Sequence, residues 1–145
     1  MPQPLFGPNT AVLVQIDVSL IVLLLAAGSY TSITRMRRKV YATPEDYQAR
    51  GVTPRDGADE AVERARRMHQ NHLENVPAFV VLSMLFAATD PNPTTLSWLL
   101  WTFLIARVLY SLAYIRAWQP YRTIAFSVGA LSMFAMIVLT LLRSS

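Results

Sequence analysis

Three apolar blocks, each about 20 residues long, limit what this chain can fold into. They cover residues 10–32, 95–115 and 123–142, and they contain only two charged side chains, Asp17 and Arg107. A helix rises about 1.5 Å per residue, so 20 residues cross the roughly 30 Å hydrocarbon core of a bilayer. Each block therefore predicts a membrane-spanning helix.

A fourth segment, residues 62–88, begins as a charged helical pattern and ends in an apolar run. The apolar run alone, residues 76–88, would cover only about 20 Å of bilayer. To cross, the segment must draw on its polar half, which places His69, Asn71, His72 and Glu74 at membrane depth. The fold expected is all-α: one integral membrane domain over residues 1–145, a four-helix bundle with spans at about 11–34, 62–88, 95–116 and 121–142.

The basic residues predict how the chain is oriented in the membrane. Nine of the 13 lysines and arginines lie in residues 35–67, and two more flank the connection between the last two spans. The positive-inside rule makes these two connections cytosolic and both termini non-cytosolic. No basic residue precedes the first block, which predicts an uncleaved anchor. The membrane expected is the bacterial inner membrane or the endoplasmic reticulum.

The composition argues against several kinds of functional site. The chain has no cysteine, which rules out disulfides, zinc–thiolate sites and a cysteine nucleophile. His69 and His72 are three residues apart but lack an evident third ligand, so no metal is expected. The net charge of +4 comes from a loop that also carries acids, a mixed pattern that argues against nucleic-acid binding.

Local signals predict two helix starts in the long loop. Thr43 precedes Pro44 and two acids, which is typical of an N-cap followed by a first helical turn. Asp59 is a second N-cap candidate, before a long helix that begins near Glu60. Residues 90–93, Asp-Pro-Asn-Pro, predict a tight turn between two spans.

Polar side chains inside the spans form stripes. Arg67, Asn71 and Glu74 share one helical face, and Arg107 shares another with Tyr114. Because a charge at mid-bilayer costs at least about 2.5–3.5 kcal/mol, we expect Glu74 and Arg107, at similar depth, to form an ion pair. More cations than anions remain near the cytosolic side, a surplus that favours an anionic ligand.

Three blocks in order resemble the MAPEG family, the membrane-associated proteins in eicosanoid and glutathione metabolism. They are RMRRKVYATPED (35–46), VERARRMHQNHLENVPAF (62–79) and ARVLYSLAYIRAWQPYRTIAF (106–126). Within the family, the chain most resembles the microsomal glutathione S-transferases. The resemblance implies a homotrimer that binds glutathione at its subunit interfaces.

The resemblance also implies the site residues. Arg122 would be catalytic, supporting the glutathione thiolate, and Asp46 and Arg107 would play supporting roles. Glutathione would be bound by Arg35, Arg67, Asn71, Glu74, Tyr110, Tyr114 and Thr123. The chain departs from the family pattern at Gln70, His72 and Phe126.

The function that follows is a membrane-bound glutathione transferase. It would conjugate the thiolate to lipophilic electrophiles, a detoxification reaction, and an additional expectation is reduction of lipid hydroperoxides. The partners expected are glutathione, the lipophilic second substrate, membrane lipid and further copies of the chain. Two alternatives stay open: a glutathione-dependent isomerase of a lipid endoperoxide, like prostaglandin E synthase, and a non-catalytic lipid-binding scaffold.

Overall fold

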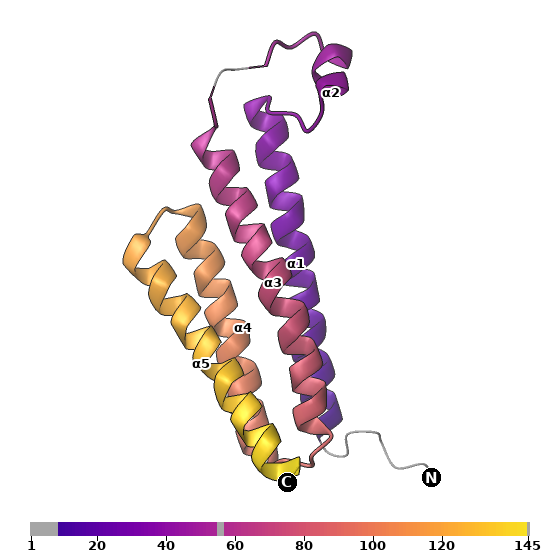
Figure 1. The fold of residues 1–145 in the computed structure, drawn as a ribbon, viewed down its shortest axis with the longest axis vertical. Coiled ribbons are helices and arrows are strands. Elements are labelled where there is room, and N and C mark those ends of the chain that lie inside the picture. Colours follow the sequence, from indigo (N-terminus) through magenta and orange to yellow (C-terminus); the bar gives the residue numbers. More distant parts are fainter. Residues whose placement is uncertain (1–8, 55–56, 145) are drawn as a thin grey trace.

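The computed structural model describes residues 9–54 and 57–144, and these form helices and no strand (Figure 1). The N-terminal stretch, whose side of the membrane the charge pattern predicts, lies outside the described residues. The helices are α1 (Thr10–Arg38), α2 (Pro44–Ala49), α3 (Glu60–Ala87), α4 (Pro93–Ile115) and α5 (Gln119–Ser144).

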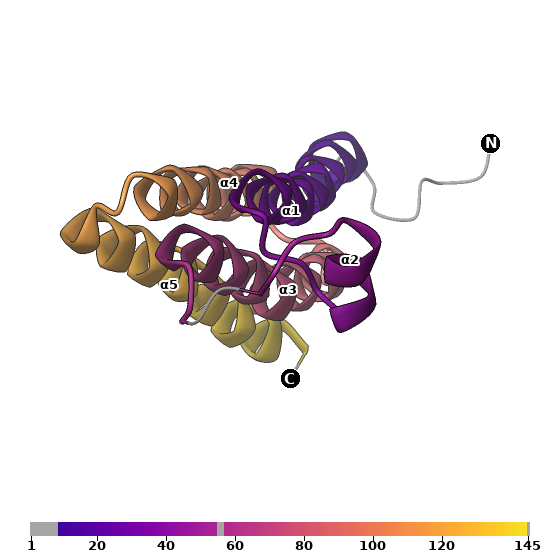
Figure 2. The same ribbon diagram turned by 90° about the horizontal axis from the view of Figure 1, so that it is seen from above.

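The four long helices run antiparallel in a bundle (Figure 1). The long connection that carries α2 and the short α4–α5 connection lie toward one end, and the α3–α4 turn lies at the other. α1 packs mainly against α3, and α4 packs mainly against α5. Seen from above, α1 and α4 form one row and α3 and α5 the other (Figure 2). The bundle is therefore two helical hairpins packed together.

Side-chain caps begin the helices where the local signals predicted them. The Thr43 side chain accepts a hydrogen bond from the backbone of Asp46, and Asp59 caps α3. Asn92, in the predicted turn, caps α4. Each cap satisfies backbone N–H groups that have no partner within the helix. α5 begins at Gln119, two residues before the expected start of the last span.

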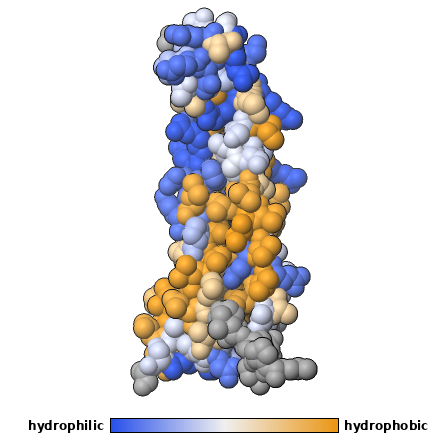
Figure 3. Space-filling model, turned by 90° about the vertical axis from the view of Figure 1, so that its right-hand side faces the viewer, coloured by the Kyte–Doolittle hydropathy of each residue, from blue (hydrophilic) through white to orange (hydrophobic). Residues whose placement is uncertain are grey.

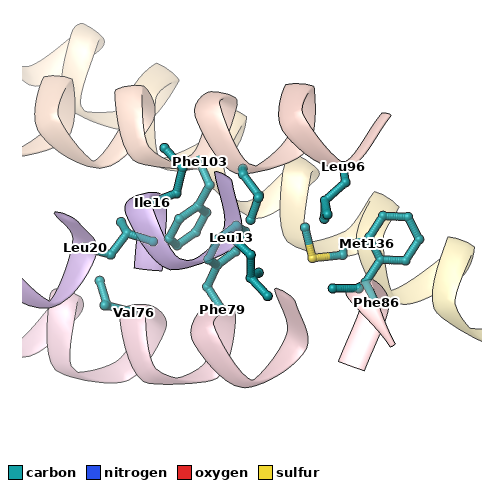
Figure 4. Close-up of a cluster of buried hydrophobic side chains, with 11 residues drawn as sticks. Leu13, Ile16, Leu20, Val76, Phe79, Phe86, Leu96, Phe103 and Met136 are labelled. Atoms are coloured by element: carbon teal, nitrogen blue, oxygen red, sulfur yellow. The ribbon is translucent and has the colours of Figure 1, made fainter. Parts of the chain in front are cut away.

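An apolar core fills the bundle toward the α3–α4 turn (Figure 4). Phe79 of α3 stacks on Phe103 of α4 with ring centres 3.7 Å apart, and both side chains are fully buried. Leu13, Ile16 and Leu20 cover this pair from α1. The core draws on all four long helices, so it fixes their relative positions.

Among the described residues, three helices are long and apolar enough to cross a membrane: α1, α4 and α5. α3 is equally long, but its first half is polar. On the face shown in Figure 3, an apolar band covers the middle of the molecule, and the end that carries α2 is hydrophilic. The chain is therefore an all-helical integral membrane protein.

Polar contacts at two levels join α1 to α3. Toward the start of α1, the buried carboxylate of Asp17 lies 2.9 and 3.1 Å from the hydroxyl of Ser83. Near its end, Thr31 donates a hydrogen bond of 3.1 Å to the carbonyl of Ala65. These contacts satisfy the buried polar side chains of Asp17 and Thr31 within the first hairpin.

Candidate functional site

A cluster of polar and aromatic side chains lies between α3, α4 and α5, centred on Arg107. Its guanidinium is 1% exposed and donates a hydrogen bond of 2.8 Å to the side-chain oxygen of Asn71. The rings of Phe103, Tyr110 and Phe126 surround the cation at 4.8–5.7 Å. Within the part of the chain that the structure describes, its Nε and Nη2 atoms have no hydrogen-bond partner. The guanidinium is therefore held by one amide and by aromatic faces, and no carboxylate in the described residues pairs with it.

The expected ion pair between Glu74 and Arg107 is absent from the structure. Glu74 is exposed on α3 and accepts a hydrogen bond of 3.1 Å from Gln70. Asn71 meets Arg107 instead. Counting residues from the helix ends gave similar depths for the two charges, but depth does not fix the side of the helix on which each lies.

A buried histidine completes the polar part of the cluster. His72 is fully buried, and its Nε2 lies 2.8 Å from the hydroxyl of Ser111. That hydroxyl donates to the backbone carbonyl of Arg107. The imidazole also meets the edge of the Tyr110 ring. His72 therefore links α3 to α4 immediately beside the Asn71–Arg107 contact.

A run of aromatic rings leads from Arg107 to Arg122. Tyr110 contacts Tyr114 with ring centres 5.1 Å apart, and the guanidinium of Arg122 lies 4.7 Å from the centre of the Tyr114 ring. Arg122 is half-buried in the first turn of α5. Among the residues that the structure describes, no carboxylate pairs with it.

A second cationic surface lies between α1 and α3. This α1–α3 groove has a volume of about 510 Å³, and Arg35, Arg66, Arg67 and Glu63 are among its lining residues. Glu63 pairs with Arg66 at 3.1 Å. No carboxylate in the described ranges pairs with Arg35 or Arg67, so the groove keeps a surplus of positive charge.

A smaller hollow of about 220 Å³ adjoins the groove, since Arg35 lines both. Asp46 of α2 lines it together with Arg50. The resemblance implied that Asp46 interacts with the catalytic arginine. Within one chain Asp46 lies near Arg35 and Arg50, and Arg122 lies over Tyr114, so a contact between Asp46 and Arg122 stays a prediction.

Comparison with known proteins places the chain in a family. Residues 15–142 match the model of the MAPEG family. The chain belongs to the MAPEG family. It is 36% identical to human microsomal glutathione S-transferase 1 over 104 residues, covering 68% of this chain and 67% of that protein. It is 28% identical to horse prostaglandin E synthase over 118 residues, covering 81% of this chain and 77% of that protein.

The candidate site residues of this MAPEG chain fall into two groups. Asn71, Arg107, Tyr110, Tyr114 and Arg122 form one chain of contacts across α3, α4 and α5. Arg35, Arg67 and Asp46 gather around the α1–α3 groove and its adjoining hollow. Glu74 and Thr123 are exposed and belong to neither group.

Two details of the MAPEG site were missed in the sequence. Arg66, which is not part of the stripe formed by Arg67, Asn71 and Glu74, lines the same groove as Arg67. His72 was placed at membrane depth and named as a departure from the family pattern, but not as a site residue. Its spacing from Met68, Val76 and Phe79 (four before, four after and seven after) places it on the buried face of α3. This periodicity is the sequence signal that indicates a buried position for His72.

The two groups differ in what they can do chemically. The α1–α3 groove offers cations to the carboxylates of a ligand. The group of contacts that begins at Asn71 ends at Arg122, and the Tyr114 ring holds this arginine in place without neutralising its charge. In the described part of the chain, no group of three or more His, Asp or Glu side chains could hold a metal ion.

Proposed function

We propose that this chain is a membrane-bound transferase that conjugates the glutathione thiolate to lipophilic electrophiles. Membership of the MAPEG family and the similarity to microsomal glutathione S-transferase 1 support it. The observation that carries the proposal is Arg122, a half-buried cation in the first turn of α5 that is positioned by Tyr114 and paired with no carboxylate in the described ranges.

A cation in this place suits thiol chemistry. A free thiol titrates near pH 8.5, so the reactive thiolate is a minor species at neutral pH. The positive charge of Arg122 would lower the pKa of a thiol beside it, helped by the backbone N–H groups that begin α5. The thiol proton goes to solvent, and the thiolate forms the new sulfur–carbon bond. The leaving group departs with the electron pair of the bond that breaks.

The remaining groups suit the rest of glutathione, which has two carboxylates and one ammonium. Arg35 and Arg67 in the α1–α3 groove would hold the carboxylates, and Glu74 would accept from the ammonium. Asn71, Tyr110 and Thr123 would complete the binding site, with Arg107 and Asp46 in support. A lipophilic second substrate would reach the thiolate from the bilayer.

We also propose that the site forms between copies of the chain, in a homotrimer. The exposed Arg67 and Glu74 support this assembly, because a single chain would leave them facing lipid if α3 crosses the membrane. The division of the site residues into two groups supports it further, since a neighbouring copy could bring the groove of one chain to Arg122 of another. The number three comes from the family resemblance.

Each chain of the proposed assembly has four spans. α3 joins the three apolar helices as a fourth, with its polar half covered by neighbouring subunits. The loop over residues 35–67 would be cytosolic and both termini non-cytosolic. Detoxification of lipophilic electrophiles is the expected role.

A glutathione-dependent isomerase is the second candidate. The similarity to prostaglandin E synthase favours it, because that similarity covers 81% of this chain. The two candidates share the thiolate and differ only in the second substrate, so substrate choice separates them.

The test uses the detergent-purified full chain. Calorimetric titration measures glutathione binding, and ultraviolet difference spectra measure bound thiolate. The purified protein is then supplied with an aryl halide, a lipid hydroperoxide or a lipid endoperoxide. The proposal expects glutathione binding, thiolate absorbance at neutral pH and conjugation of the aryl halide. Isomerisation of the endoperoxide alone would favour the second candidate, and lipid binding without glutathione binding would leave only the scaffold.

A further inference from the structure

An apolar groove lies between α4 and α5, and the proposed glutathione chemistry does not use it. Its volume is about 420 Å³. Three alanines, Ala106, Ala113 and Ala125, are buried beneath it. Exposed apolar side chains such as Leu109 and Ile124 form its sides. Small residues between larger ones hollow the surface where two helices meet.

The groove has the length of one membrane leaflet. Its lining on α4 runs from Thr102 to Arg116, which is about 21 Å along a helix. One leaflet of a bilayer, with its headgroup region, is about 20–22 Å thick. Both α4 and α5 are among the helices that can cross a membrane, so the groove lies at the depth of acyl chains.

The mouth of the groove, at the α4–α5 connection, is polar and cationic. The guanidinium of Arg116 lies 5.0 Å from the centre of the Trp118 ring, and Trp118 contacts Tyr121. All three residues line the groove. No carboxylate in the described ranges pairs with Arg116, and the connection itself contains no acid. Exposed tryptophan and tyrosine are typical of the membrane–water interface.

We propose that this groove binds a membrane phospholipid with an anionic headgroup, taken from the leaflet at the α4–α5 connection. One acyl chain lies over the three alanines, and the phosphate pairs with Arg116. The assignment is based on an apolar groove that ends at Arg116, a cation that no carboxylate in the described ranges pairs with. A phospholipid has the matching arrangement, because its apolar acyl chain is joined to an anionic headgroup. Trp118 and Tyr121 each offer a polar hydrogen at the headgroup level.

The test measures lipid retention. The full chain is reconstituted in nanodiscs of phosphatidylglycerol and phosphatidylcholine in equal amounts, and native mass spectrometry records which lipid stays bound on release. Phosphatidylglycerol should be retained preferentially. Arg116→Ala should lower that preference about fivefold. This factor corresponds to the binding free energy that one basic residue contributes near an anionic surface, about 1 kcal/mol. Arg37→Ala, which removes an exposed arginine outside the groove, is the matched control and should change nothing.

Two further variants test the groove itself. Val128→Trp adds bulk at an exposed side of the groove and should abolish retention of both lipids. Because the chain has no cysteine, Leu109→Cys introduces a single thiol into the groove. A disulfide between subunits at this position would show that a second copy covers the groove and would overturn the proposal. Equal retention of the two lipids, or no effect of Arg116→Ala, would also overturn it.

Discussion

The guanidinium of Arg122 lies over the face of Tyr114, 4.7 Å from the ring centre. A carboxylate would hold the arginine more tightly but would cancel its charge. An aromatic face positions the cation and leaves its charge available to an anion. The pairing thus suits an arginine whose proposed partner, a thiolate, comes from the ligand.

The first prediction concerns Arg122. Arg122→Ala should lower the rate of aryl halide conjugation at neutral pH by about 100- to 1000-fold, the usual effect of losing one donor to an anion in a dry site. Without the cation, the pKa of the bound thiol rises toward its free value, so fewer thiolates exist at pH 7 and raising the pH restores part of the rate. The pH–rate profile measures this.

Two companion variants sharpen the Arg122 test. Arg122→Lys should be intermediate, because it keeps the charge and loses the planar guanidinium. Arg116→Ala removes an arginine six residues away and should leave the profile unchanged. A wild-type rate for Arg122→Ala across the whole pH range would rule out the thiolate role.

The second prediction concerns the α1–α3 groove. Arg67→Ala should weaken glutathione binding by about 10- to 100-fold, because a charged hydrogen bond is worth about 1.5–3 kcal/mol. The control is Arg64→Ala: Arg64 pairs with Glu60 at 3.2 Å and does not line the groove. Calorimetric titration compares the two. Equal losses would indicate general misfolding and not a lost contact.

The third prediction separates stability from binding at Arg107. Replacing a buried charge that has no ion-pair partner by an apolar side chain of similar length removes a desolvation cost. Arg107→Met should therefore keep or raise the melting temperature of the glutathione-free protein. It should also weaken glutathione binding, because Asn71 loses the donor that positions it. Parallel losses of melting temperature and affinity would assign Arg107 a structural role alone.

The fourth prediction concerns the α1–α3 contact between Asp17 and Ser83. Ser83→Ala leaves the buried carboxyl group without its side-chain partner and should destabilise the protein by about 1–3 kcal/mol. Asp17→Leu combined with Ser83→Ala should recover most of that loss, since no unsatisfied polar group remains. A double-mutant cycle of unfolding free energies measures the coupling. Additive single effects would contradict it.

The sequence predicted the helices well because their signals are local. Apolar blocks mark the long helices, and Thr43 and Asp59 cap helices through contacts within three residues. The polar half of α3 continues as one helix into the apolar half, as expected for residues 62–88. Its place in the membrane cannot be read from hydropathy, because the side chains that would be covered are polar.

The contacts between helices were predicted less well. Glu74 was paired with Arg107 on depth alone, but it lies on the exposed side of α3, and Asn71 takes its place. His72 was not among the predicted site residues, although its spacing matches the buried face. Family resemblance named Tyr114 and Arg122 as site residues, but their direct contact depends on how α4 and α5 pack together.

The division of polar contacts between the two hairpins bears on how the protein is made. Within each hairpin, polar side chains find local partners: Ser83 for Asp17 in the first, and the Leu99 carbonyl for Ser132 in the second. Two contacts differ, because they join the hairpins: Arg107 donates a hydrogen bond to Asn71, and His72 lies 2.8 Å from the hydroxyl of Ser111. During biosynthesis, the second hairpin therefore carries an unpartnered arginine until it docks on the first. A charge without its partner is costly inside a membrane, so Asn71→Leu should shorten the lifetime of newly made chains in a pulse–chase experiment. The contacts between the hairpins thus form only when the two halves of the bundle have packed together.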